Sequence, residues 1–201
     1  MFIMDKWKMN DQGCDFVFSG KNPIPFMLPN GMKEIQDLDI WKNSLDRGNK
    51  FPLFKLSEYQ NSSDSHPQLN FLEISDTEIE IAIPMVENRK DTILILKTSN
   101  THSMPALRRA MVSLMDSNSK IPVVLKVNYP DQTADETMLY AATDVGGLLI
   151  DGLGDGIFIS LEKDKSHTRE EFLEQIKLHN ATGFGVLQAA RTRMSKTEYS
   201  S

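Results

Sequence analysis

The stretch Thr92–Val127, TILILKTSNTHSMPALRRAMVSLMDSNSKIPVVLKV, decides the expected fold. Residues 92–96 form a continuous apolar run, which is typical of a parallel strand buried on both faces. A helix is expected to open at Ser103, because the apolar residues that follow recur at helical spacing. Residues 123–127 are a second apolar run. A strand, a helix and another strand in this order predict a mainly parallel α/β sheet.

The same pattern extends upstream of this stretch. Residues 69–74 are a strand candidate. Ser75 and Glu78 have the spacing of a capping box, in which each side chain accepts a hydrogen bond from a free amide at a helix start. The isoleucines that follow alternate as in a strand, but Pro84 and the need for a crossover between parallel strands favour a kinked helix.

Helices and strands are expected to alternate downstream as well. Capping-box pairs begin helices after Thr133 and after Thr168. Residues 147–150 and 157–159 are interpreted as two strands on either side of a glycine loop, and a separate last helix is predicted over 184–194.

We expect one α/β domain over residues 1–201. It would comprise a less regular part (1–65), a regular βα part (66–195) and a C-terminal tail (196–201). Two short strands are predicted in the less regular part, at residues 15–18 and 53–56. A chain of 201 residues is long enough for one sizeable core.

Composition excludes several classes of function. The formal net charge is −6, which argues against non-specific binding to nucleic acid and against docking to anionic lipid. Residues 1–15 lack the apolar run of a secretory signal, and no apolar run reaches the roughly 18 residues of a membrane span. The single cysteine, Cys14, excludes an internal disulfide. A cytoplasmic protein is the expectation.

The densest chemical feature is the loop Asp151-Gly152-Leu153-Gly154-Asp155-Gly156. Its glycines and amides could approach a phosphate or another ligand, or the loop could contact a partner. The alternative is a tight strand-to-strand turn, which is favoured because the spacing departs from G-x-G-x-x-G and a strand follows. The candidate residues for a ligand or interface loop are Asp151, Gly152, Gly154 and Asp155.

Other reactive side chains carry weaker signals. Arg191 and Arg193 are candidates for docking an acidic partner or a phosphate, although such pairs are usually solvated helix faces. Cys14 has no activating neighbour in sequence and is predicted to be a small core residue. No metal-binding histidine motif is present, and all four histidines are predicted at the surface: His66, His102, His167 and His179.

The chain resembles the (E)-4-hydroxy-3-methylbut-2-enyl diphosphate synthases. The resemblance is carried by residues 146–156 (GGLLIDGLGDG), 187–194 (LQAARTRM) and 196–199 (KTEY), and it is strong over 92–199. In that family a similar loop, helix and Thr-Glu-Tyr segment precede a Cys-Pro-x-Cys motif, which begins the domain that holds a [4Fe–4S] cluster.

This resemblance implies a fold and a role. The family's three-domain form has a domain inserted between its catalytic barrel and its cluster domain, and this chain looks like that insert. The implied fold is a TIM-barrel-like or partial (βα) barrel with a mainly structural role. No catalytic, cofactor-binding or metal-binding residue of the family has a matching position here. One cysteine cannot hold a cluster, so no cofactor is expected in this chain.

For the full-length protein the resemblance implies an oxidoreductase of the non-mevalonate isoprenoid pathway. It would convert 2-C-methyl-erythritol 2,4-cyclodiphosphate reductively to hydroxymethylbutenyl diphosphate, using the [4Fe–4S] cluster and a donor such as flavodoxin or ferredoxin. The partners of this chain would be the catalytic barrel and cluster domains of the same polypeptide. The isolated chain is expected to be inactive.

Two other readings stay open. One is a stand-alone barrel protein that binds a phosphorylated small molecule through Asp151 and Asp155 near strand ends. The other is an interaction module that binds a partner through Arg191 and Arg193. A Rossmann dinucleotide domain ranks last, because the glycine loop lacks a following helix.

Overall fold

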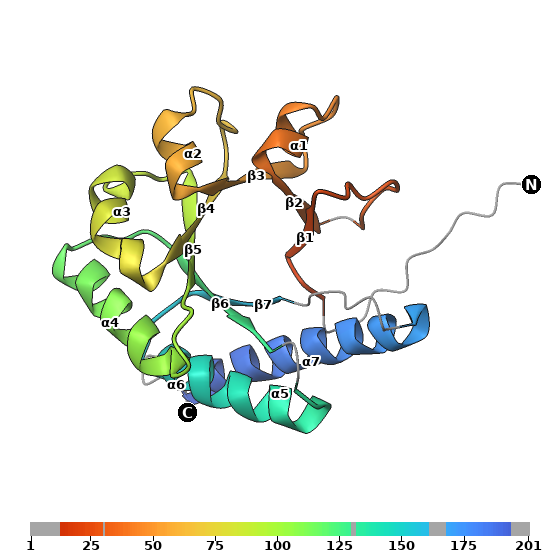
Figure 1. Ribbon diagram of the computed structural model, residues 1–201, viewed down its shortest axis with the longest axis vertical. Coiled ribbons are helices and arrows are strands. Elements are labelled where there is room, and N and C mark those ends of the chain that lie inside the picture. The colour runs from red at the N-terminus through yellow and green to blue at the C-terminus, as the bar shows by residue number, and fades with distance from the viewer. Residues whose placement is uncertain (1–12, 30, 130–131, 161–167, 194–201) are drawn as a thin grey trace, which may run out of the picture.

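A curled sheet of seven parallel strands dominates the computed structural model, which describes residues 13–29, 31–129, 132–160 and 168–193 (Figure 1). The strands lie in chain order, so each pairs with the one before it. Their bounds are β1 Phe16–Gly20, β2 Lys33–Asp37, β3 Lys50–Lys55, β4 Asn70–Ser75, β5 Thr92–Lys97, β6 Val123–Asn128 and β7 Gly156–Ser160. The predicted α/β fold with a partial parallel barrel is confirmed.

Helices connect the strands and lie along the outer side of the curled sheet (Figure 1). This is the arrangement that successive right-handed β-α-β crossovers produce. The helices are α1 Leu38–Lys42, α2 Leu56–Asn61, η1 Asp76–Glu78, α3 Ile79–Val86, α4 Ser103–Asp116, α5 Ala134–Ala141, the π-helix η2 Ala142–Gly146, α6 Gly147–Ile150 and α7 Arg169–Arg193.

The sheet buries apolar side chains on both faces, as a parallel sheet requires. Successive residues of a strand point to opposite faces. On β4, Leu72 joins the large cluster between the sheet and its helices, whereas Phe71 joins a smaller cluster inside the curl. Within the inner cluster the ring of Phe16 makes edge contacts with Phe51 and Phe71.

The two edges of the sheet approach each other without pairing. No strand pairing between β1 and β7 is present in the described part of the chain. Instead, the ring of Phe18 on β1 lies edge-on to Phe158 on β7, with 5.7 Å between centroids. The barrel is therefore partial, and aromatic side chains bridge its open side.

Most of the predicted regular elements are confirmed. The strands predicted at 69–74, 92–96 and 123–127 correspond to β4, β5 and β6. The kinked helix is η1 followed by α3, which contains Pro84. The predicted capping boxes are also present. For example, the Ser75 amide donates a hydrogen bond to the Glu78 carboxylate at 2.8 Å.

The prediction of a strand over 147–150 is wrong. These residues form α6, the end of a helical run that starts at the Thr133 cap and continues through α5 and η2. A short apolar run has no period that separates a strand from a buried helix. Leu148 and Leu149 are buried by helical packing, so the glycine loop joins a helix to β7.

The prediction of two C-terminal helices is also wrong. A helix does begin after Thr168, whose amide donates to Glu171 at 2.8 Å. It then continues without interruption to Arg193 as α7. Gly183 and Gly185 both lie inside this helix. Contacts with β7 and α5 keep the backbone helical despite the low propensity of glycine.

Three elements of the less regular part, β2, α1 and α2, were not predicted from the sequence. The β2 sequence, KEIQD, is mostly polar, yet Glu34 is 2% exposed and Gln36 is fully buried. The Glu34 carboxylate accepts hydrogen bonds from Ser19 (2.5 Å), the Ile24 amide and Gln36 (both 3.0 Å). Burial opposes the charge, but these bonds outweigh it and lower the pKa of Glu34.

Three predictions for single residues are wrong. Cys14 is exposed rather than in the core. His66 is buried, because its ring packs on Phe51 and its Nδ1 accepts the Gln68 amide at 3.2 Å. His179 is buried in α7. His102 is exposed as expected, and His167 lies outside the described residues.

Candidate functional site

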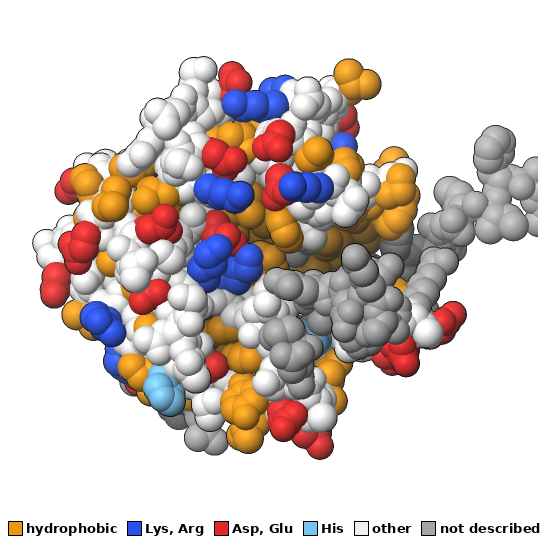
Figure 2. Space-filling view, in the orientation of Figure 1, with side chains coloured by type: hydrophobic (Ala, Val, Ile, Leu, Met, Phe, Trp, Pro, Cys, Tyr) orange, Lys and Arg blue, Asp and Glu red, His pale blue; other side chains and the backbone are white. Residues whose placement is uncertain are grey.

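Three charged side chains meet inside the curl at the carboxyl ends of neighbouring strands. Glu73 on β4, Lys97 on β5 and Lys126 on β6 each come two residues after a member of the inner apolar cluster, so they share the inner face. Figure 2 looks onto this end of the barrel and shows acidic and basic side chains gathered around its middle. Functional groups of barrel enzymes lie at this end.

Glu73 accepts a hydrogen bond from each lysine. Its Oε1 lies 2.6 Å from Lys97 Nζ and its Oε2 lies 2.5 Å from Lys126 Nζ. The Glu73 side chain is 11% exposed, that of Lys126 19% and that of Lys97 45%. Burial opposes ionisation of Glu73, but the bonds and charges of the two lysines outweigh it and lower the pKa of this carboxyl.

The two lysines are neighbours across the sheet. The register that pairs Leu96 with Leu125 brings Lys97 beside Lys126 on the inner face. The Lys126 ammonium also lies 5.0 Å from the centroid of the Phe158 ring on β7. The cluster therefore joins β4, β5, β6 and β7 at one end of the barrel.

An open pocket of about 380 Å³ borders this cluster. Its polar lining comes from Lys55, Ser57, Gln60, Glu73, Glu78 and Lys97. Glu78 is engaged as a helix cap, since its carboxylate accepts both the amide and the hydroxyl of Ser75 at 2.8 and 2.9 Å.

A second polar group lies at the same end. Tyr129, which follows β6, donates to Asp144 of the π-helix η2 at 3.0 Å. Burial raises the pKa of the Asp144 carboxyl; the Tyr129 hydrogen bond and the charge of His102 oppose this rise. Burial and the Asp144 charge raise the pKa of Tyr129. This pair ties the π-helix to the end of β6.

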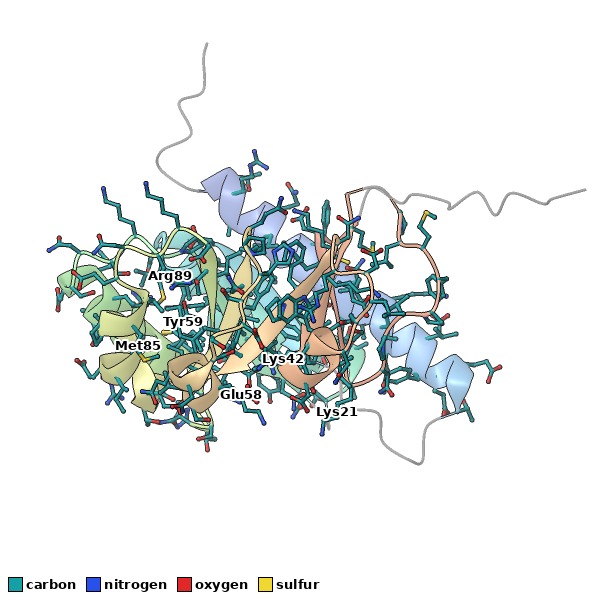
Figure 3. All side chains as sticks on the ribbon, turned by 90° about the horizontal axis from the view of Figure 1, so that it is seen from above. Lys21, Lys42, Glu58, Tyr59, Met85 and Arg89 are labelled. Atoms are coloured by element: carbon teal, nitrogen blue, oxygen red, sulfur yellow. The ribbon has the colours of Figure 1, made fainter. Side chains whose placement is uncertain are left out.

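The opposite end of the barrel carries structural contacts. Figure 3 labels Arg89 and Tyr59 close together, with Glu58 of α2 farther from Arg89. Arg89 forms two hydrogen bonds of 2.8 Å with Asp91 and stacks on the Tyr59 ring. The Tyr59 hydroxyl contacts Thr92 at 3.0 Å.

The glycine–aspartate loop predicted from sequence precedes β7, so it lies at this amino end and away from the lysines. The Asp155 carboxylate accepts the Val123 amide at 2.9 Å, and its own amide donates to the Val123 carbonyl at 2.7 Å. Asp151 pairs with Arg108 at 2.6 Å. Gly152 and Gly154 have φ angles of +76° and +110°.

The arginines predicted for docking lie in the last turn of α7. Arg191 is exposed. The side chain of Arg193 and the tail 196–201 lie outside the described residues.

The lysine–glutamate cluster was not predicted from the sequence. A signal was present, because each of three apolar strand runs contains or ends on one charged residue: Glu73, Lys97 and Lys126. A charge at an inner-facing position of a buried strand needs a partner. Recognising the partners requires the register between strands, which the sequence does not reveal.

The residues present do not fit an iron–sulfur cluster. Such clusters are held by three or four cysteine thiolates, and the chain has one cysteine, the exposed Cys14. In the part of the chain that the structure describes, no three His, Cys, Asp or Glu side chains are grouped to hold a metal ion. Nor does any helix there have the length and apolar character needed to cross a membrane.

Comparison with known proteins identifies relatives of one kind. The chain is 30% identical over 186 residues to the 4-hydroxy-3-methylbut-2-en-1-yl diphosphate synthase (flavodoxin) of Parabacteroides distasonis, and 30% identical over 189 residues to that of Bacteroides thetaiotaomicron. It is 36% identical over 104 residues to the chloroplastic ferredoxin form of Arabidopsis thaliana. No family model matches the chain, and no solved structure matches it.

The alignments cover most of this chain but little of its relatives. With each of the two bacterial proteins, the match spans 92% of this chain and 28% of the relative. With the Arabidopsis protein it spans 51% of this chain and 12% of the relative. The resemblance predicted from the glycine–aspartate loop and the last helix is thereby confirmed. Over 92% of its length, the chain is therefore similar to a domain-sized part of the 4-hydroxy-3-methylbut-2-en-1-yl diphosphate synthases.

Proposed function

We propose that this chain works as a non-catalytic domain of a full-length 4-hydroxy-3-methylbut-2-en-1-yl diphosphate synthase, inserted between a catalytic barrel and a cluster domain. The observation that carries the proposal is the pair of coverages: the bacterial alignments span 92% of this chain and 28% of each relative. A spacer of fixed shape would limit the relative positions of the other two domains. Their reaction requires the cluster and the substrate to be held close together.

The carboxyl end of the barrel supports a non-catalytic role. Barrel enzymes use this end for catalytic groups. Here Glu73, Lys97 and Lys126 are bonded to one another. A carboxylate with a lowered pKa that already accepts two ammonium groups is a poor general base, because protonating it costs both bonds.

Exposed apolar side chains support contact with another domain. Met138 and Leu139 on α5 are 55% and 60% exposed, and Leu173 and Ile176 on α7 are 46% and 43% exposed. The two helices pack together (Figure 1). Large apolar side chains gathered on one face are typical of an interface. We propose that this α5–α7 face contacts a neighbouring domain of the same polypeptide.

For the full-length protein we propose the reaction that the family resemblance implies. This is reductive opening of the cyclic diphosphate at a [4Fe–4S] cluster held by another domain, in the cytoplasm. The names of the relatives specify flavodoxin or ferredoxin, and we propose one of these as the electron donor. The isolated chain, as one domain over 1–201, would have no activity.

A domain exchange tests the proposal. In the Parabacteroides distasonis synthase, the aligned segment would be replaced either by this chain or by a flexible Gly/Ser linker of matched span. Reduction of the cyclic diphosphate would be assayed with reduced flavodoxin. We expect the chimera with this chain to keep measurable activity and the linker variant to lose it. Full activity with the linker would contradict a spacing role.

A further inference from the structure

The ammonium groups of Lys97 and Lys126 repel each other unless enough negative charge lies beside them. Like charges directly opposite each other on neighbouring strands destabilise a sheet. The one carboxylate bonded to both, Glu73, leaves the trio with an excess positive charge at a position where Lys126 is only 19% exposed. The chain as a whole is acidic, with a net charge of −6. A local excess of positive charge on such a chain favours the binding of an anion.

We propose that Lys97, oriented by Glu73 and flanked by Lys126, binds a small phosphate-type oxyanion together with Lys55, either free phosphate or a phosphomonoester. The inference does not rest on the proposed synthase role. Each ammonium carries three protons and gives one of them to Glu73 in this structure. The ammonium groups can therefore donate to a second acceptor while the Glu73 bonds hold them in place.

The pocket next to the cluster gives this ligand room. It is lined by Lys97, by Ser57 and by Lys55, which is exposed at the end of β3; Lys126 lies behind Glu73 and is not part of the lining. A serine hydroxyl and lysine ammonium groups are common donors to phosphate. The second carboxylate of the pocket, Glu78, is turned to the Ser75 cap.

A phosphate matches the site better than a single carboxylate does. Phosphate presents several acceptor oxygens, and near pH 7 it carries between one and two negative charges. It can therefore bridge two or three ammonium groups at once. The carboxyl ends of parallel strands are also where α/β proteins bind such ligands.

Titration of the 201-residue chain with inorganic phosphate would test the site. Nitrogen–proton NMR spectra would be followed at pH 7.5, with sodium chloride adjusted to hold the ionic strength constant. We expect saturable shifts confined to the ends of β3, β5 and β6. Shifts that do not saturate, or that chloride alone reproduces, would overturn the proposal. A parallel titration with methyl phosphate distinguishes the sources, since tighter binding of the ester indicates an organic phosphate and equal binding indicates phosphate itself.

Two variants keep the test independent of folding. Lys55→Gln alters an exposed side chain, so the fold should survive, and we expect phosphate affinity to fall by about tenfold. The matched control is Lys177→Gln, an exposed lysine on α7 that pairs with Glu174 at 2.6 Å. Its affinity should equal that of the unaltered chain. Equal losses in both variants would show only general charge screening and would overturn the site.

Discussion

Glu73 is the residue on which the inner end of the barrel depends. It keeps two lysines on neighbouring strands from facing each other without a counter-charge. Replacing it by glutamine keeps the shape and removes the charge. We expect Glu73→Gln to lower the free energy of unfolding by about 2 kcal/mol, less than for a fully buried pair because Lys97 is half exposed. Urea denaturation at pH 7 measures this, with Glu80→Gln, an exposed carboxyl on α3, as control.

The same residue gives a prediction for acid pH. The folded protein lowers the pKa of Glu73, so ionised Glu73 stabilises the fold. That contribution is complete above the unfolded pKa, near 4.3. It is lost as the pH falls through the lower, folded pKa. Unfolding midpoints measured between pH 6 and pH 3 should therefore fall less steeply for Glu73→Gln than for the unaltered chain. Parallel curves would mean that Glu73 is not coupled to folding.

Gly154 shows why the glycine–aspartate loop has its composition. Its φ is +110°, and an added Cβ would lie 3.1 Å from Leu125 side-chain atoms. We expect Gly154→Ala to destabilise the chain by about 2 kcal/mol through strain and crowding. Gly152 has a φ of +76° but open space around it, so Gly152→Ala should cost about 1 kcal/mol. Thermal unfolding compares the two, and an equal loss would argue against crowding by Leu125.

At the scale of elements, Tyr129, which follows β6, donates a hydrogen bond to Asp144 of the π-helix η2. Tyr129→Phe removes that bond to Asp144. We expect a loss of about 1 kcal/mol at neutral pH. Because the bond favours the charged carboxylate, the pKa of Asp144, already raised by burial, should rise further. Carbon-detected NMR titration of Asp144 reports this directly. Tyr140→Phe, on the neighbouring ring, is the control and should leave the pKa unchanged.

The unbroken helix α7 gives a second prediction at this scale. Gly185 lies inside the helix, is exposed, and has no atom within 4 Å of an added Cβ. Gly185→Ala should therefore stabilise the chain by up to about 1 kcal/mol. At Gly183 the added Cβ would lie 3.5 Å from Ile157, an ordinary contact, so Gly183→Ala should be tolerated. A loss of helical circular dichroism in either variant would indicate that α7 bends at its glycines.

An element could be predicted from the sequence when the pattern that identifies it lies within a few neighbouring residues. The strands β4, β5 and β6 are continuous apolar runs, and capping boxes depend on residues three apart, so both were found. β2 was missed because the partners of Glu34, such as Ser19 and Ile24, become neighbours only after folding. The same limit hid the Glu73 cluster, which needs the register of three strands.

The predicted ligand loop illustrates a different limit. Gly152 and Gly154 have the positive φ angles that a tight turn favours, but composition alone could not tell a ligand loop from a structural turn. The contacts of the two aspartates are non-local: the Asp155 carboxylate accepts the Val123 amide, and Asp151 pairs with Arg108. Both carboxylates are used in contacts within the fold, so we place the candidate site at the charged cluster at the other end of the barrel, and the ligand loop stays a prediction.

At the scale of the whole molecule, the barrel has a face that its own fold leaves uncovered. Leu139 on α5 and Ile176 on α7 are 60% and 43% exposed. Replacing an exposed apolar residue by serine changes the stability of an isolated domain by little, within about 0.5 kcal/mol. The same change at a domain interface removes buried apolar area, at roughly 25 cal/mol per Å². The effect of one substitution thus depends on whether the other domains are present.

The double variant Leu139→Ser, Ile176→Ser separates these cases. In the isolated chain we expect an unchanged urea midpoint. In the chimeric synthase that carries this chain, we expect a lower thermal midpoint and a lower rate of substrate reduction, because the domains would no longer be held in register. Met115→Ser on α4, 59% exposed on another part of the surface, should leave both preparations unchanged. If the double variant also leaves the chimera unchanged, the α5–α7 face is not the interface, and the spacer must dock through a different surface.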